Sequence, residues 1–266
     1  MELRNLMNII VCIKQVPDTS EVRIDPETNT IIREGVPSII NPFDENAIEE
    51  AVQLVEEHGG KVTVLSMGPP QAEAALREAL AMGCDEAILV SDRCFAASDT
   101  LATSYVLSTA ISQIEDYDLI LTGKQAFDGD TAQVPPGIAE QLGIPQVTFA
   151  IGLEVDGKNG RVRRMLEEEF EVVEVKMPAL LSCVKQMNEP RRPGIKAKLA
   201  AKKKDVEVWD AGCIDAEACL CGFDGSPTRV VRTFAPTRDI QGEKFEGEPA
   251  ECAETLVERL IAEKII

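Results

Sequence analysis

Short apolar segments alternate with helical patterns over the first half of the chain, and this alternation limits the possible folds more than any other feature. The apolar segments are continuous enough for strands that are buried on both faces, at residues 8–16, 61–65, 86–90 and 118–121. Apolar residues at helical spacing follow these segments, at residues 47–55, 72–82, 101–114 and 136–142. Four such repeats predict an α/β fold with a doubly wound parallel sheet and right-handed crossovers.

Antiparallel hairpins are predicted at two places outside this alternation. In each, two strand-like segments flank a polar turn, at residues 21–24 with 30–33 and at residues 161–165 with 170–176. An apolar strand over residues 179–183 follows the second hairpin. We therefore expect hairpin insertions beside the parallel sheet.

The C-terminal part of the chain has a different composition. Residues 209–249 are rich in Gly, Pro and Thr with little periodicity, and residues 251–263 predict a closing amphipathic helix. We expect a nucleotide-binding α/β domain over residues 1–208. Residues 209–266 are expected to form an extended arm and helix that pack on a partner subunit.

The acidic composition excludes several classes of function. The chain has 266 residues and a formal net charge of −19, and such a field repels nucleic acid and anionic membrane surfaces. Its apolar runs are too short to cross a bilayer, and residues 1–6 lack a signal-peptide core. We therefore expect a cytoplasmic protein that binds no nucleic acid and does not insert into a membrane.

Eight cysteines are present, and most lie singly in apolar or helical segments. A chain of this size needs no disulfides, so we expect reduced thiols. The spacing of Cys213, Cys219 and Cys221 matches neither paired zinc ligation nor iron–sulfur ligation. No metal site is expected.

The segment from Gly123 to Val134 joins a predicted strand to a predicted helix through a tight polar turn. Such a turn presents unpaired backbone N–H groups at the positive end of a helix, where a phosphate binds readily. Residues 12–16 and 66–70 follow other parallel strands and should meet this turn at the same edge of the sheet. Asp128 and Asp130 are interpreted as capping or turn residues rather than metal ligands.

The sequence contains no set of residues typical of hydrolytic or acid–base catalysis. The single histidine, His58, is expected at the C-terminal end of a helix, where its charge would favour the helix dipole. We therefore expect no catalytic side chain. A bound cofactor would supply the chemistry, and the protein would supply position and field.

A basic island covers residues 185–204, where eight Lys and Arg residues occur with one acid, Glu189. It is either a solvated loop and helix or a docking element for an acidic partner. Asn188 to Arg191 predicts a rigid turn. Ile195 is expected to be an exposed apolar anchor surrounded by basic side chains.

Six motifs in order resemble the small (beta) subunit of electron-transfer flavoproteins over nearly the whole chain. They are Val11–Asp18, Asn41–Asp44, Leu80–Gly83, Gly123–Val134, Arg164–Ser182 and Asn188–Arg191. Residues 91–95, 98–104 and 128–133 resemble the bifurcating kind of anaerobes, found with acyl-CoA dehydrogenases or reductases, for example in a caffeyl-CoA reductase complex.

This resemblance implies an adenine nucleotide alpha hydrolase-like fold and a partner alpha subunit that holds FAD. The small subunit would hold a second FAD that accepts hydride from NADH, or alternatively AMP. Electrons would pass to ferredoxin and, through the alpha subunit, to an acyl-CoA dehydrogenase or enoyl-CoA reductase.

The resemblance also implies roles for individual residues. The adenine nucleotide part would be held by Cys12, Asn41, Pro42, Phe43, Asp44, Met67, Ala126, Phe127, Asp128, Gly129, Asp130, Thr131, Ala132, Gln133, Val134 and Pro135. The flavin ring would lie near Asp99, Thr100, Thr103 and Ser104. Partner docking would involve Asn188, Arg191 and Ile195. Phe127 replaces the usual isoleucine and Pro135 the usual glycine, and a proline there removes one N–H group.

Three interpretations remain open from the sequence. The first is a bifurcating redox subunit, and the second is a subunit that keeps a structural AMP. The third is an adenine-nucleotide sensor that acts alone, which the unpatterned tail disfavours.

Overall fold

The computed structural model describes residues 6–18, 37–231 and 242–266. Contacts divide these residues into two units: residues up to 231 form the first, and residues 242–266 form the second. The predicted hairpin over residues 21–33 lies outside the described residues.

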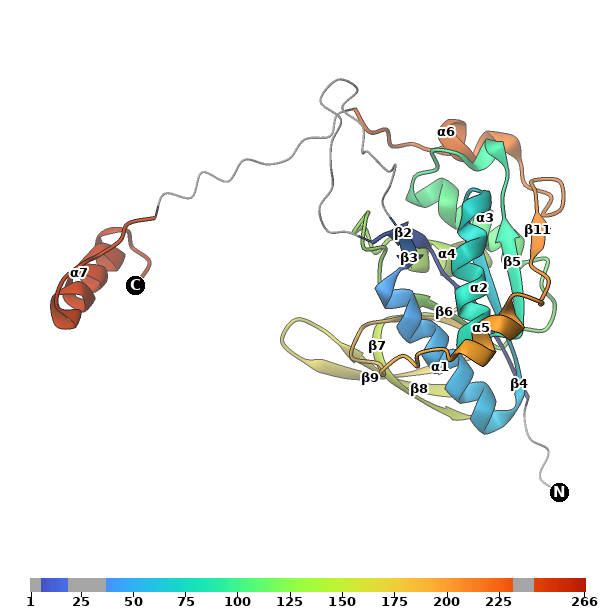
Figure 1. Ribbon diagram of the computed structural model, residues 1–266, viewed down its shortest axis with the longest axis horizontal. Helices are drawn as coiled ribbons and strands as arrows, with labels where there is room; N and C mark the ends of the chain where they lie inside the picture. Colours follow the sequence, from blue (N-terminus) through green and yellow to red (C-terminus); the bar gives the residue numbers. More distant parts are fainter. Residues whose placement is uncertain (1–5, 19–36, 232–241) are drawn as a thin grey trace. The chain divides into compact units, whose positions relative to one another are not determined.

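The first unit is built on a nine-stranded sheet with the order β11-β5-β4-β1-β6-β10-β7-β8-β9 (Figure 1). Its strands are β1 (Met7–Cys12), β4 (Gly60–Met67), β5 (Glu86–Val90), β6 (Leu119–Gly123), β7 (Gln146–Asp156), β8 (Asn159–Met165), β9 (Phe170–Lys176), β10 (Ala179–Cys183) and β11 (Glu207–Trp209). All neighbours pair in parallel except β7 with β8 and β8 with β9. The predicted parallel sheet and the hairpin over residues 161–176 are confirmed.

Helices cover both faces of the parallel sheet (Figure 1). One buried cluster joins the sheet to α1 (Pro42–His58), α2 (Glu73–Met82) and the end of α5 (Ile195–Ala201). The other joins the opposite face to α3 (Thr100–Ile111), α4 (Val134–Leu142) and buried residues such as Ile214 and Cys221. The doubly wound arrangement is therefore confirmed.

The first predicted strand is shorter than expected. Residues 8–16 were expected to form one strand, but β1 ends at Cys12, and β2 (Gln15–Pro17) pairs antiparallel with β3 (Ser38–Ile40) in a separate sheet. The N–H of Ile13 still donates to the carbonyl of Leu65 at 2.9 Å, after which the chain leaves the parallel sheet. Lys14 therefore lies just beyond the C-terminal end of β1, at the edge where the parallel strands end.

Several short elements complete the first unit. They are the 3-10 turns η1 (Pro70–Ala72), η2 (Arg93–Phe95) and η3 (Ala218–Leu220) and the helical turn α6 (Gly222–Gly225). Residues 209–231 pack on this unit, because β11 pairs with β5 and Ile214 and Cys221 are fully buried. The expected division at residue 208 and the packing of the arm on a partner stay predictions.

The second unit contains α7 (Pro249–Ala262), and the expected amphipathic helix is confirmed. None of its residues is buried, and Leu256, Val257 and Ile261 are exposed. No helix in the described parts of the chain is long and apolar enough to cross a membrane.

Candidate nucleotide-binding site

The C-terminal ends of β1, β4 and β6 lie side by side, as predicted. Cys12 is in register with Leu65 of β4 and with Thr122 of β6. The Gln15 side chain donates to the carbonyl of Gln71 at 3.1 Å and so joins the segment after β1 to the segment after β4. Cys12 and half-buried Met67 are therefore at one edge of the sheet with the loop of residues 124–133, which follows β6.

Asn41 holds this loop against the start of α1. Its amide donates to the carbonyl of Gln125 at 2.8 Å and accepts from the N–H of Phe127 at 3.0 Å. It occupies the N-cap position of α1, with Pro42 at the first helical position as expected, but its side chain makes no capping hydrogen bond. The buried Asn41 side chain thus fixes the loop rather than the helix end.

Asp44 joins three segments at the same edge. Its carboxylate accepts from the N–H of Lys14 at 2.7 Å, from the Asn41 amide at 2.8 Å and from the N–H of Gly123 at 3.1 Å. Burial raises the pKa of Asp44 to about 7, although these three hydrogen bonds and the charge of Lys14 act to lower it. Burial, together with the nearby Asp44 carboxylate, also raises the pKa of the Cys12 thiol to about 12, so this thiol is not a nucleophile at neutral pH.

The loop itself is held by pairs of side chains. Lys14 Nζ lies 2.6 Å from Asp128 Oδ1, and Gln125 donates to Asp130. Asp130 and Ala132 adopt left-handed backbone conformations, with φ of 53° and 54°. Gln133, not an aspartate, is the N-cap residue of α4, and its side chain does not cap. Asp128 and Asp130 are therefore turn residues and not helix caps.

The end of the loop offers backbone donors to a ligand. The N–H groups of Thr131, Ala132, Gln133 and Val134 have no hydrogen-bond partner among the described residues. Pro135 and Pro136 have no N–H, so the donors come from the end of the loop and the first helical residue only. Ala126 and the exposed Phe127 and Gly129 complete the segment.

The four residues expected near a flavin ring lie at and after the start of α3. Asp99 caps α3 by accepting from Leu101 and Ala102, and its other oxygen accepts from the N–H and hydroxyl of Thr228. Burial acts to raise the pKa of Asp99, but these hydrogen bonds outweigh it and hold the pKa below its usual range. The carboxylate therefore has several protein partners.

Ser104 is buried between α3 and α4. Its hydroxyl donates to the carbonyl of Thr100 at 2.7 Å, and a Cβ at Gly137 would lie 2.4 Å from it. Ser104 therefore fixes the helix contact, whereas Thr100 and Thr103 are half-buried.

Two features of this edge were missed from the sequence. Lys14 reaches the loop, and the buried Thr122 hydroxyl has no hydrogen-bond partner in the described chain. A signal for both existed: each is a polar residue at the C-terminal end of an apolar run. Pro42 and Phe43, which were predicted, are the first two residues of α1, and the carbonyl carbon of Phe43 lies beside Gly123.

Two of the expected docking residues, Asn188 and Arg191, lie in a different region, along α1. Asn188 bonds with Asn46 and Glu50, and Arg191 pairs with Glu49 at 2.8 Å and Glu56 at 2.6 Å. The Arg191 guanidinium is therefore engaged within the chain rather than free as a basic rim. Ile195, the first residue of α5, is 81% exposed, as expected of an anchor.

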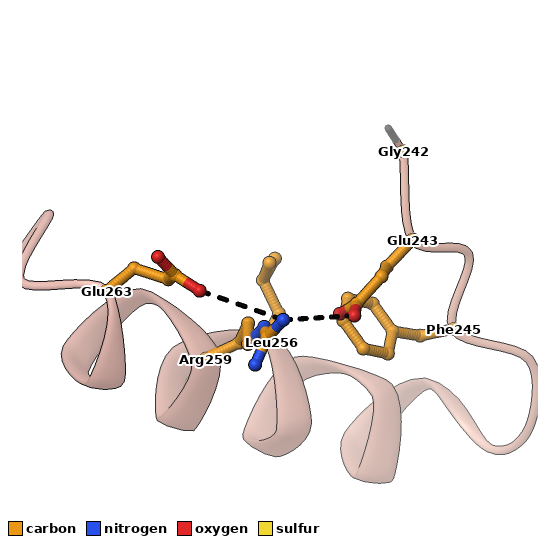
Figure 2. A pocket seen from close by; sticks show the side chains of 6 residues that line it. All are labelled: Gly242, Glu243, Phe245, Leu256, Arg259 and Glu263. Carbon is orange, nitrogen blue, oxygen red and sulfur yellow. Dashed lines mark hydrogen bonds and ion pairs between the residues drawn. The ribbon is translucent and has the colours of Figure 1, made fainter. Parts of the chain in front are cut away.

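A hollow with a volume of about 440 Å³ lies within the second unit. Figure 2 shows Arg259 between Glu243 and Glu263, at 3.1 and 3.7 Å, with Phe245 and Leu256 beside them. This hollow is formed by residues 242–263 alone and contributes nothing to the nucleotide site described above.

Comparison with known proteins gives a consistent result. Residues 28–212 match the family model described as the electron transfer flavoprotein domain. The chain is 55% identical, over 98% of its length and the whole of the relative, to the electron transfer flavoprotein subunit beta of Thermoanaerobacterium thermosaccharolyticum. It is 47% identical, over 98% of its length and the whole of the relative, to the caffeyl-CoA reductase-Etf complex subunit CarD of Acetobacterium woodii. It is also 48% identical to protein FixA of Azorhizobium caulinodans, over 87% of this chain and 85% of that protein. The chain belongs to the electron transfer flavoprotein family, among its beta subunits.

Proposed function

We propose that this beta subunit binds FAD at the edge formed by β1, β4, β6 and the loop of residues 124–133, and that it works in NADH-dependent electron bifurcation. The observation that carries this proposal is the loop itself, which Asn41 and Asp44 hold in place while its N–H groups at residues 131–134 remain without protein partners in the described chain. Unpaired donors at a helix start favour a phosphate.

The residues present fit the adenylate part of a nucleotide. Donors at Thr131 to Val134 would face phosphate oxygens, and the exposed Phe127 would offer an apolar ring. Bound FAD would supply hydride acceptance from NADH and transfer of single electrons. The chain's own residues would bind and orient the nucleotide.

The bifurcating role is supported by the resemblance of residues 91–104 and 128–133 to the bifurcating kind. The proposed partners are an alpha subunit with its own FAD, ferredoxin, and an acyl-CoA dehydrogenase or enoyl-CoA reductase in the cytoplasm. The Acetobacterium relative is named as a caffeyl-CoA reductase-Etf complex subunit, which supports a partner of the last kind.

The alternative proposal is a structural AMP at the same edge. The loop donors favour it equally, because they would bind the phosphate that AMP and FAD share. The two alternatives differ in whether the region of Thr100 and Thr103 at α3 also faces a flavin ring.

Substitution of Thr131 tests the location of the nucleotide. Thr131→Glu places a carboxylate beside the proposed phosphate, where like charges cost on the order of several kcal/mol when water is excluded. The purified complex should lose the nucleotide bound by the beta subunit. Thr131→Val keeps the size of the side chain and the backbone N–H, so this variant should retain the nucleotide. Full nucleotide content in the Glu variant would place the nucleotide elsewhere.

A further inference from the structure

Lys14 is fixed by its backbone at the centre of the nucleotide-binding edge. Its N–H donates to Asp44 at 2.7 Å, and its carbonyl accepts from the N–H of Asn41 at 2.9 Å. It follows β1, which lies between β4 and β6 in the sheet. The backbone of Lys14 is therefore held in place by hydrogen bonds, whereas its ammonium group lies outside the core.

The Lys14 side chain extends from just beyond β1 to the loop of residues 124–133. Lys14 Nζ lies 2.6 Å from Asp128 Oδ1, and the two side chains are 48% and 29% exposed. An ion pair this exposed adds little stability. Holding the loop is thus a weak explanation for the pair, since the buried Asn41 side chain already binds Gln125 and Phe127.

The charge of the loop gives a better explanation. Residues 124–133 contain two aspartates and one lysine, and that lysine, Lys124, has its ammonium 5.5 Å from the centre of the Phe149 ring. A phosphate bound to the N–H groups of residues 131–134 would meet the carboxylates of Asp128 and Asp130. Asp130 accepts from the neutral Gln125, so Lys14 is the cation that faces the acidic side of the loop in the described structure.

We propose that Lys14 is a phosphate-binding residue of the nucleotide site, with Asp128 as its counter-ion. An ammonium has three N–H donors and can contact a carboxylate and a phosphate together. Lys14 would attract the phosphate, and Asp128 would repel it. This inference rests on the proposed nucleotide site and adds a residue to it.

The two partners of the ion pair therefore have opposite predicted effects. Lys14→Met keeps the length of the side chain and removes its charge, and it should weaken AMP binding about tenfold, or about 1.4 kcal/mol. Lys14→Arg keeps the charge and should bind nearly as the wild type does. Asp128→Asn removes the repulsion, keeps the volume and should bind AMP more tightly than the wild type.

The test is calorimetric titration of the complex with its alpha subunit, stripped of nucleotide, with AMP and with adenosine as probes. Adenosine lacks the phosphate, so its affinity should be the same in all four proteins. Weaker binding of both probes by both Lys14→Met and Asp128→Asn would show that the pair only holds the loop, and would overturn the proposal. So would unchanged AMP affinity in Lys14→Met. A wild-type complex that binds neither probe would instead refute the nucleotide site itself.

The Asp128→Asn arm also covers the case in which Lys14→Met does not fold. Tighter AMP binding in that variant supports the charge assignment by itself, and weaker binding contradicts it. High ionic strength should reduce the difference between Lys14→Met and wild type, because both charges are partly exposed.

Discussion

The Asp44 carboxylate accepts a hydrogen bond from the backbone N–H of Gly123 at 3.1 Å, and a Cβ at residue 123 would lie 2.2 Å from the same oxygen. That Cβ would also lie 2.7 Å from the carbonyl carbon of Phe43 and 2.8 Å from the backbone nitrogen of Asp44. The end of β6 therefore approaches the start of α1 this closely only because residue 123 has no side chain. This contact sets the position from which the loop of residues 124–133 begins.

Gly123→Ala should therefore destabilise the protein. The added methyl group meets backbone atoms that cannot move alone, and overpacking of this kind costs about 1–3 kcal/mol. Denaturant unfolding of the variant should show a lower midpoint. Gly129→Ala is the matched control, because a Cβ there meets nothing within 4 Å and φ is not positive. Equal stability of the two variants would contradict the described contact.

The buried Asp44 carboxyl should make stability depend on pH. Its pKa is about 7 in the folded protein and near 3.8 when exposed, so the folded state holds the proton more tightly. The contribution of Asp44 to the free energy of unfolding is therefore largest at low pH. It decreases as pH rises from about 4 to about 7, by at most about 1.4 kcal/mol per pH unit. Above pH 7 the loss is complete.

Asp44→Asn isolates this effect from other titrating groups. The unfolding free energy of wild type minus that of the variant should decrease between pH 4 and pH 7 and then remain level. A difference that is constant, or that increases with pH, would show that Asp44 does not titrate as the structure indicates. The variant is also expected to be less stable at low pH, because its amide cannot accept from the N–H groups of both Lys14 and Gly123 and from Asn41.

The structure separates two roles within the basic island. Arg191→Ala should cost about 1–3 kcal/mol of unfolding free energy, because the buried Glu49 loses its charged partner. Although burial acts to raise the pKa of Glu49, the hydrogen bonds from Arg191 hold it below its usual range, so the carboxylate is charged and needs that partner. Arg192→Ala, at the exposed neighbour, should leave the unfolding midpoint unchanged, and equal losses in the two variants would contradict this assignment.

Ile195→Ala should instead leave stability unchanged and weaken delivery of electrons to the proposed acyl-CoA dehydrogenase or reductase partner. The side chain is 81% exposed, so its loss removes an anchor and no core contact. Val172→Ala, at a residue that is 54% exposed on β9, is the control for loss of an exposed apolar group. Docking at Ile195 is refuted if the two variants support electron delivery at the same rate, or if only Ile195→Ala unfolds at lower denaturant.

The parallel sheet could be predicted because its strands are short apolar runs separated by amphipathic helices. The end of β1 at Cys12 could not be predicted, because Ile13 and Val16 continue the apolar pattern of the strand. Nothing in that pattern indicates that the chain leaves the parallel sheet and that β2 pairs with β3. β7 was not predicted either. It runs over 11 residues, pairs parallel with β10 and then antiparallel with β8, and mixes buried and exposed residues without a clear period.

The candidate site was predictable as a region but not as a set of contacts. The polar turn after an apolar strand indicated the loop, whereas the partner of each side chain depends on residues far away in sequence. Arg191 and Glu49 are 142 positions apart, and Lys14 and Asp128 are 114 apart. The charge pattern of the sequence therefore predicted a free basic side chain at Arg191. Only the folded structure shows that Arg191 pairs with Glu49 of α1.

The cofactor content of the purified complex with the alpha subunit tests the central claim most directly. The complex should be denatured, and the released FAD and AMP should be counted by chromatography against the protein concentration. Two FAD and no AMP per heterodimer, with loss of flavin absorbance on addition of NADH, is the predicted result. One FAD and one AMP, with flavin absorbance unchanged by NADH, would contradict the bifurcating role and support the structural AMP instead.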